Sequence, residues 1–331
     1  AVNLATPSIG GTMNIVTDPT AQKFGVGLKQ EFGNVGFLKT TLHANSGKMG
    51  KFAFNVNIVK ISGDGLINKT WTDEWAYYAG LSYELNKTNR LELYAIGAPQ
   101  RHGQNLYKQN AATYSHEYAK DELGYSQADL DAKAESKDGR KYNENWSNVS
   151  ESYKGQQWTT SMWAFSPEGS AQDRYDPSFI NERENFFHKP IVNLNWYSQF
   201  SKKVSLYTTA YWSGGIGGGT GTYGSVVWDY DTQPTRIVDY DATIAANSAG
   251  ESQGILRNSR NDQNTYGLIS KLYWKLNNNW KLSFGVDWRT AEIDHYREVR
   301  DLLGGSYFIY DGDDFASTDR KVLGDKIAYY N

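Results

Sequence analysis

The sequence predicts an all-β fold, a transmembrane antiparallel β-barrel of which this chain is an incomplete part. Three observations favour this class. Apolar residues recur at every second position over segments of about ten residues, the length of a tilted membrane strand. Short and long connections alternate along the chain, as they do in outer-membrane barrels. Aromatic residues make up 15% of the 331 residues, although the chain is polar on average.

Three strands are predicted in the first part of the chain, each with one apolar and one polar face. Their apolar faces are, in order, Phe24, Val26, Leu28 and Phe32; Leu38, Thr40, Leu42 and Ala44; and Phe52, Phe54, Val56 and Ile58. Glycine, lysine, asparagine and other small or polar residues fill most of the positions between them. This alternation is typical of strands that meet apolar surroundings on one side only.

Six further strands are predicted as three hairpins. Their apolar faces are Trp75 to Leu85 (odd positions) with Leu91, Leu93 and Ala95; Val192, Leu194, Trp196 and Phe200 with Val204, Leu206, Thr208, Ala210 and Trp212; and Leu268, Leu272, Trp274 and Leu276 with Trp280, Leu282, Phe284, Val286 and Trp288. Tryptophans near the strand ends are the residues expected at the two membrane interfaces. The last residues, from Ile327, are expected to begin a tenth strand.

The connections between these strands differ strongly in length. The short ones lie around 46–50, 86–89, 201–203 and 277–279, and the long ones, after an opening link near 33–36, at about 63–74, 99–189, 213–265 and 291–326. Antiparallel strands reverse direction at every connection, so all the short turns are expected at one end of the sheet. The long polar segments are then expected on the outer side of the membrane.

Composition excludes several function classes. The chain has no Cys, only five His and a net charge of −3, so it offers no disulfide framework, thiolate metal site or basic surface for nucleic acid. The segment Gly219–Gly224 satisfies G-x-G-x-x-G, but no βαβ unit surrounds it, and we interpret it as a flexible loop tip. No catalytic motif is found. We therefore predict a protein that is not an enzyme and needs no cofactor or metal.

The N-terminal segment Ser8–Thr17 carries a specific resemblance. Its sequence Ser-Ile-Gly-Gly-Thr-Met-Asn-Ile-Val-Thr resembles the segment that closes the plug domain of TonB-dependent outer-membrane receptors and leads into their first barrel strand. The residues that carry this resemblance are Gly10, Gly11, Asn14, Ile15 and Thr17. Two adjacent glycines permit the sharp backbone turn that such a segment needs.

The resemblance implies how the chain is organised. Residues 1–20 would form the C-terminal end of the plug, and residues 21–331 the first nine to ten strands of a 22-strand barrel. Such a chain would be an internal stretch of a longer protein in the outer membrane of a Gram-negative bacterium. Its implied partners are outer-membrane lipid, a small nutrient ligand and, through the missing part of the plug, the TonB complex of the inner membrane. A surface lipoprotein is a further candidate partner.

Aromatic residues in the long connections are the candidate ligand-binding residues. Rigid rings among amide and charged neighbours suit the capture of a polar or ring-bearing ligand at an outer mouth. The residues selected are Trp146, Trp158, Trp163 and Tyr175 in segment 99–189, and Trp228 and Tyr230 in segment 213–265. The alternative is that these rings only pack the long segments against their neighbours.

The function expected from these observations is TonB-dependent active uptake of a scarce nutrient. An iron chelate, cobalamin, a glycan and a peptide are all compatible with the sequence. Two alternatives are a plugless passive porin, for which the Ser8–Thr17 string is coincidence, and a soluble carbohydrate-binding β-protein.

Overall fold

The computed structural model describes residues 18–155, 157–160, 169–172, 174–310, 320–322 and 326–329, with side chains for 18–155, 157 and 174–310. The plug-closing residues Gly10, Gly11, Asn14, Ile15 and Thr17 lie outside the described residues. The described chain begins with a short 3-10 helix, η1 (Pro19–Ala21), capped by the carboxylate of Asp18.

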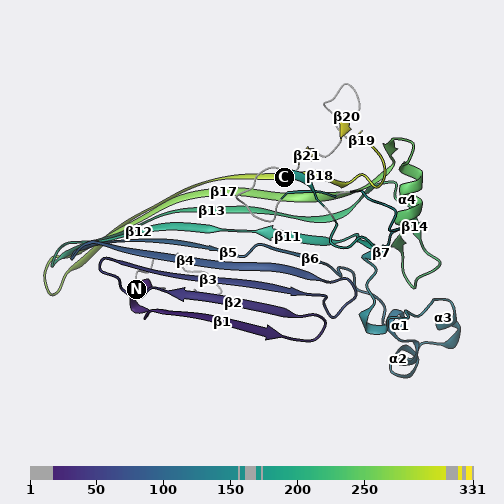
Figure 1. Cartoon of the computed structure of the whole chain (residues 1–331), viewed down its shortest axis with the longest axis horizontal. Helices are drawn as coiled ribbons and strands as arrows, with labels where there is room; N and C mark the ends of the chain where they lie inside the picture. The colour runs from purple at the N-terminus through teal and green to yellow at the C-terminus, as the bar shows by residue number, and fades with distance from the viewer. Residues whose placement is uncertain are drawn as a thin grey trace.

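Twelve strands of the described part form one antiparallel sheet (Figure 1). Its main path runs β1 (Gly25–Phe32), β2 (Leu38–Asn45), β3 (Phe52–Gly63), β4 (Thr72–Asn86), β5 (Asn89–Gly97), β12 (Ile191–Ser201), β13 (Val204–Gly224), β17 (Gly254–Lys275), β18 (Lys281–Asp301) and β21 (Lys326–Tyr329). The nine predicted strands are thus neighbours in chain order, and β21 supplies the tenth. The short turns lie together at the narrow end of the sheet, and the α-helices lie at the other, wide end.

Two strands of the sheet are interrupted by proline. β6 (Gln100–Gly103) continues β5 after Pro99, because both pair with β4 in one unbroken register. In the same way β11 (Glu184–His188) runs into β12 across Pro190. Proline has no N–H to give to the ladder, yet its carbonyl still accepts: Trp75 N donates to Pro99 O at 2.8 Å and Gly214 N to Pro190 O at 3.0 Å. The first and the last residues of the connection predicted at 99–189 therefore belong to the sheet, as β6 and β11.

Strands β13, β17 and β18 are much longer than predicted, with 21, 22 and 21 residues. The connection predicted at 213–265 comprises only residues 225–253, because β13 ends at Gly224 and β17 begins at Gly254. The first residues of the connection predicted at 291–326 belong to β18, which ends at Asp301. The Gly219–Gly224 segment is strand, not a loop tip, so that interpretation was wrong. Its neighbour Gly218 shows why glycine is used here: an added Cβ would lie 2.7 Å from Ser259 O and 2.9 Å from Phe186 Cζ.

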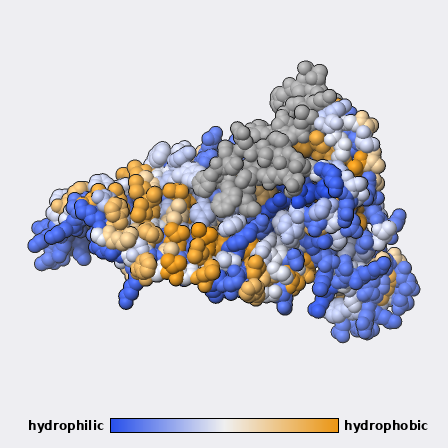
Figure 2. All heavy atoms as spheres, in the orientation of Figure 1, coloured by the Kyte–Doolittle hydropathy of each residue, from blue (hydrophilic) through white to orange (hydrophobic). Residues whose placement is uncertain are grey.

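An apolar band crosses one side of the sheet (Figure 2). Register pairs place one row of it side by side across the strands: Phe54, Leu81, Leu93, Leu194, Ala210, Leu268 and Trp288. Its large side chains are exposed, from 40% at Phe54, Leu81 and Leu268 to 55% at Trp288. The adjacent row on the other side is mainly polar and includes Ser82, Glu92, Asn195 and Thr209. The predicted alternation of faces is confirmed for these strands.

Beyond the band, the side that carries Leu93 and Leu194 becomes charged and buried. In the same register it carries Arg101 and Glu184, and Arg101 donates to Glu184 Oε2 through Nε at 2.9 Å and Nη2 at 2.6 Å. Glu184 also accepts from Arg300 Nη2 at 2.9 Å. Chain segments from the long connections cover this part of the sheet, since Arg300 Nη2 also donates to Gln157 Oε1. The same side of the sheet is therefore exposed in the band near the short turns and enclosed by protein toward the wide end.

The covering segments hold short elements at the wide end of the sheet. The helices are α1 (Ala111–Tyr114), α2 (His116–Asp121), α3 (Gln127–Asp131), α4 (Tyr240–Asn247) and the 3-10 helix η2 (Gly139–Lys141). Three strand pairs are β7 (Trp146–Asn148) with β10 (Phe179–Asn181), β8 (Gln157–Thr160) with β9 (Gly169–Gln172), and β14 (Trp228–Asp229) with β15 (Ile237–Val238). A small sheet consists of β16 (Glu251–Ser252), β19 (Tyr307–Tyr310) and β20 (Arg320–Val322). Among the helices of the described residues, none is long and apolar enough to cross a membrane.

These segments share a hydrophobic cluster of their own. It consists of Val149, Ile180, Val226, Val238, Tyr240, Leu256 and Leu303. Its members come from both long connections, from the first residues of β17 (Leu256) and from the chain just after β18 (Leu303), so the cluster ties the covering segments to the sheet. Tyr240 is 1% exposed, and burial raises the pKa of its hydroxyl well above the ordinary value. The covering segments thus form a packed layer with its own core at the wide end of the sheet, which we call the outer layer.

Candidate functional site

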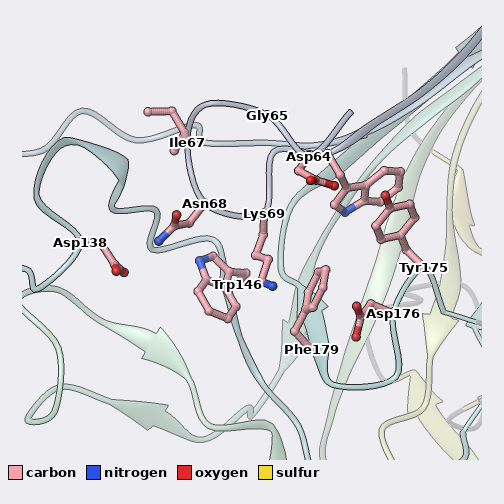
Figure 3. Close-up of a pocket in the computed structure, with 11 residues that line it drawn as sticks. Asp64, Gly65, Ile67, Asn68, Lys69, Asp138, Trp146, Tyr175, Asp176 and Phe179 are labelled. Carbon is pink, nitrogen blue, oxygen red and sulfur yellow. The ribbon is translucent and has the colours of Figure 1, made fainter. Parts of the chain in front are cut away.

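The candidate site is a cavity of about 470 Å³ at the outer end of β3 and β4 (Figure 3). Three segments that are far apart in sequence build it: the β3–β4 connection, the stretch that leads into β7, and the stretch that leads into β10. Its lining residues are Asp64, Gly65, Ile67, Asn68, Lys69, Trp71, Asp138, Trp146, Tyr175, Asp176 and Phe179. This volume lies within the range of about 300–1,000 Å³ that is usual for small-molecule sites.

Two stacked aromatic rings form one wall of the cavity. The Trp71 and Tyr175 rings lie parallel, with centroids 3.7 Å apart and an interplanar angle of 4°. The guanidinium carbon of Arg101 lies 5.3 Å from the Trp71 ring centroid, and Trp71 Nε1 donates to Asn181 Oδ1 at 2.9 Å. Trp71 is only 2% exposed, whereas Tyr175 is 46% exposed. The stack therefore holds Tyr175 rigidly and leaves part of that ring accessible.

Lys69 lies between two further aromatic rings. Its Nζ atom is 4.1 Å from the Phe179 centroid and 5.1 Å from the Trp146 centroid, both within cation–π range. Its backbone has a φ of +57°, which is uncommon for a residue other than glycine. The Asn181 side chain holds this conformation, because its Nδ2 donates to Lys69 O at 2.9 Å. A constrained backbone of this kind is frequent at binding sites.

Acidic side chains complete the lining. The described residues that line the cavity include three carboxylates, Asp64, Asp138 and Asp176, and one cationic side chain, Lys69. Asp176 accepts from Ser178 Oγ at 2.5 Å and from Ser178 N at 2.7 Å. The side-chain hydrogen bond from Ser178 is the main reason that the pKa of Asp176 lies below its ordinary value, so this carboxylate is ionised at neutral pH. The lining therefore carries an excess of negative charge.

The structure brings together two of the six aromatic residues proposed from the sequence. Trp146 and Tyr175 both line the cavity, and Figure 3 shows them on opposite sides of Lys69. Trp228 does not line it; that ring lies 4.1 Å from the guanidinium of Arg236 and packs against the hydrophobic cluster, which agrees with the packing alternative. Tyr230 is 66% exposed and is not in the lining. Trp163 and the side chain of Trp158 lie outside the described residues.

Sequence reasoning missed most of the lining. Lys69, Trp71 and Asp64 lie in the predicted connection 63–74, in which no ligand-binding residue was predicted. Trp71 is an aromatic residue in the middle of that polar connection, the signal already used for segment 99–189. Phe179 and Asp176 follow Tyr175 closely in sequence. No sequence pattern, however, joins these residues to one another.

The cavity carboxylates do not form a metal centre. Within the part of the chain that the structure describes, no group of three or more His, Asp or Glu side chains could hold a metal ion.

Comparison with known proteins gives distant structural likeness only. No protein-family model matches the sequence, and no curated protein matches it either. The chain is similar to the open form of the ferric-catecholate import receptor Fiu from E. coli K12, with a TM-score of 0.48 and 13% identity over 83% of this chain and 35% of that one. For the closed form of Fiu the TM-score is 0.43 and the identity 10%, over 93% of this chain and 46% of that one. The chain thus spans less than half the length of these structures.

Proposed function

We propose that this chain is part of an outer-membrane receptor that takes up a scarce nutrient, and that the aromatic cavity is an outer capture site for its ligand. The observation that carries the proposal is the exposed apolar band on one side of a long antiparallel sheet. A contiguous band of large exposed apolar side chains is unfavourable in water and suits contact with lipid. On β13 it extends from Val204 to Trp212, close to the length of about 9–11 residues that a tilted strand needs to cross the hydrocarbon.

The remainder of the molecule supports the same topology. The short turns lie at one end, and the packed outer layer with its cavity lies at the other. The exposed apolar band disfavours the soluble carbohydrate-binding alternative, because a soluble protein with such a surface would tend to aggregate. The resemblance of Ser8–Thr17 to a plug-closing segment supports TonB-dependent uptake over passive diffusion through a porin. Residues 1–20 are accordingly proposed as the end of a plug and the following chain as the first part of a barrel.

Surface labelling tests the topology. This chain has no Cys, so single cysteines at Ser150 and Asn278 of the full-length protein, with any Cys outside this chain replaced by Ser, give a clean comparison. Ser150 lies in the outer layer and Asn278 in a short turn, and both are exposed. A thiol reagent that cannot cross the outer membrane should label the cysteine at Ser150 in intact cells and spare the one at Asn278. Labelling of Asn278 alone would invert the topology and refute the outer position of the cavity.

Energy dependence separates active uptake from a passive channel. Cells that lack the TonB complex should still bind the ligand at their surface but should no longer take it up. Uptake at an unchanged rate in those cells would favour the porin alternative.

A further inference from the structure

We infer that the cavity takes a neutral saccharide, with one sugar ring against Tyr175 and its hydroxyl groups hydrogen-bonded to the cavity carboxylates. The inference rests on the proposed function in taking this cavity as the capture site. Among the ligand classes that the sequence left open, it favours a glycan over an anionic iron chelate and over a cationic peptide.

The charge of the lining disfavours an anionic ligand. Among the described residues of the lining, Asp64, Asp138 and Asp176 outnumber the one cation, Lys69. An anionic iron chelate would bring further negative charge against three carboxylates, and like charges that meet in a binding site oppose association. Figure 3 shows the carboxylates of Asp64 and Asp176 on the Tyr175 side of the cavity, so the exposed ring itself lies in acidic surroundings.

A cationic ligand is disfavoured by the position of Lys69. Its ammonium group already lies over the Phe179 and Trp146 rings, at 4.1 and 5.1 Å from their centroids. The aromatic faces that would attract a ligand cation are therefore engaged by the chain's own cation. A second positive charge in the same place would be repelled by this ammonium group.

A neutral polyhydroxyl ligand satisfies both kinds of polar group in the lining. Each hydroxyl is one donor and has two acceptor lone pairs, so it can donate to a carboxylate of Asp64 or Asp176 and accept from Lys69 Nζ. Hydrogen bonds to ionised groups are the stronger ones. The volume of about 470 Å³ is suited to a small ligand of this kind.

The aromatic stack supplies the apolar part of the contact. One face of a sugar ring is mainly C–H, and Tyr175, which lines the cavity and is 46% exposed as a residue, offers a flat aromatic ring for that face to lie against. Trp71 supports Tyr175 from behind at 3.7 Å, so little side-chain freedom remains to be lost on binding. A preformed platform and flanking carboxylates together define the site.

Binding to the full-length receptor in detergent tests the inference. The probes are neutral disaccharides and trisaccharides of glucose, galactose and mannose, a ferric tricatecholate and a lysine-rich peptide, each measured by titration calorimetry. We expect at least one of the saccharides to bind and the other two probes not to bind at this site. Tyr175→Ala should weaken saccharide binding about tenfold, and Tyr175→Phe, which keeps the ring, should retain it.

Two further variants test the role of the carboxylate and the specificity of the ring effect. Asp176→Asn should weaken saccharide binding, because the charged acceptor is replaced by a neutral one. Tyr230→Ala removes an exposed ring outside the cavity and should leave binding unchanged. Binding of none of the saccharides, Tyr175-dependent binding of the ferric tricatecholate or of the peptide, or an equal loss in Tyr175→Ala and Tyr230→Ala would each overturn the inference.

The failure of the inference is distinguishable from that of the proposed function. Saccharide binding that depends on Tyr175, in a protein that does not import the saccharide, would refute uptake and leave the ligand class standing. Energy-dependent uptake of an iron chelate would support the receptor and refute the saccharide.

Discussion

The buried ion pairs between the outer layer and the sheet, on the covered part of β6, β11 and β18, give the sharpest prediction about stability. Glu184 Oε2 accepts three hydrogen bonds, two from Arg101 and one from Arg300. Glu184→Gln keeps the shape of the side chain and removes its charge. Arg101 is partly exposed, with 16% of its side-chain surface accessible, and can be hydrated again, whereas Arg300 has 1% and cannot. The cost of the substitution is therefore mainly that of leaving Arg300 buried without this partner.

The magnitude follows from the surroundings of Arg300. Burial, and then the charge of Arg101, lower the pKa of Arg300 to about 10, so its charged form is less favoured than that of an ordinary Arg even with Glu184 present. Breaking a buried ion pair costs about 3–5 kcal/mol. Asp301 and Glu298 also favour the charge of Arg300, so we expect the lower end, about 3 kcal/mol. That free energy corresponds to a population of opened outer layer about 100-fold larger.

Limited proteolysis of the full-length protein in detergent measures this population. When opening and closing are fast relative to cleavage, the cleavage rate in the outer segments follows the population of the open form. The matched control is Glu84→Gln, which breaks the exposed ion pair of Lys48 and Glu84 at 2.7 Å. Exposed pairs contribute about 0–1 kcal/mol, so the control should change cleavage little. Similar cleavage of both variants would refute the view that the buried network holds the outer layer together.

Two further predictions concern the sheet. Phe284→Arg should impair membrane assembly by about 2–4 kcal/mol if Phe284 lies near the bilayer midplane, whereas Ser283→Arg on the other side should be tolerated; equal damage in a folding assay in lipid vesicles would refute the assigned faces. Gly218→Ala should destabilise the outer part of the sheet by about 1–3 kcal/mol, because the added Cβ meets Ser259 O at 2.7 Å. Gly285→Ala, whose Cβ would meet nothing closer than 3.6 Å, is its control; urea denaturation that does not separate the two variants would contradict the close packing at Gly218.

The sequence by itself determined the strands of the band, their faces and the turns at the narrow end. These features depend on residues close together in the chain. In any strand, successive side chains point to opposite sides, so residues that recur at every second position share one face. The short turns are closed by their own side chains, as where Asn277 Oδ1 accepts from Asn279 N and Trp280 N, both at 2.9 Å. Such local preferences can be recognised without knowledge of the partners.

Only the tertiary structure decided how far the strands extend. Beyond the band the alternation disappears, because chain from the long connections covers the side that is exposed lower down. Arg260 on β17 has the same strand phase as Leu268, yet it is almost fully buried, with its Nη1 donating to Glu298 Oε1 at 2.9 Å. A buried charged residue in a strand looks like an exposed one in sequence, so these positions were predicted as loop.

The cavity too was decided by tertiary structure. Trp146 and Tyr175 could be proposed from composition, but their partners come from the β3–β4 connection. The hydrogen bond from Trp71 Nε1 to Asn181 joins residues 110 positions apart, and the stack of Trp71 on Tyr175 joins residues almost as distant. Contacts at such separation depend on how the covering segments fold back over the sheet, which is a property of packing and leaves no periodic signal in the chain.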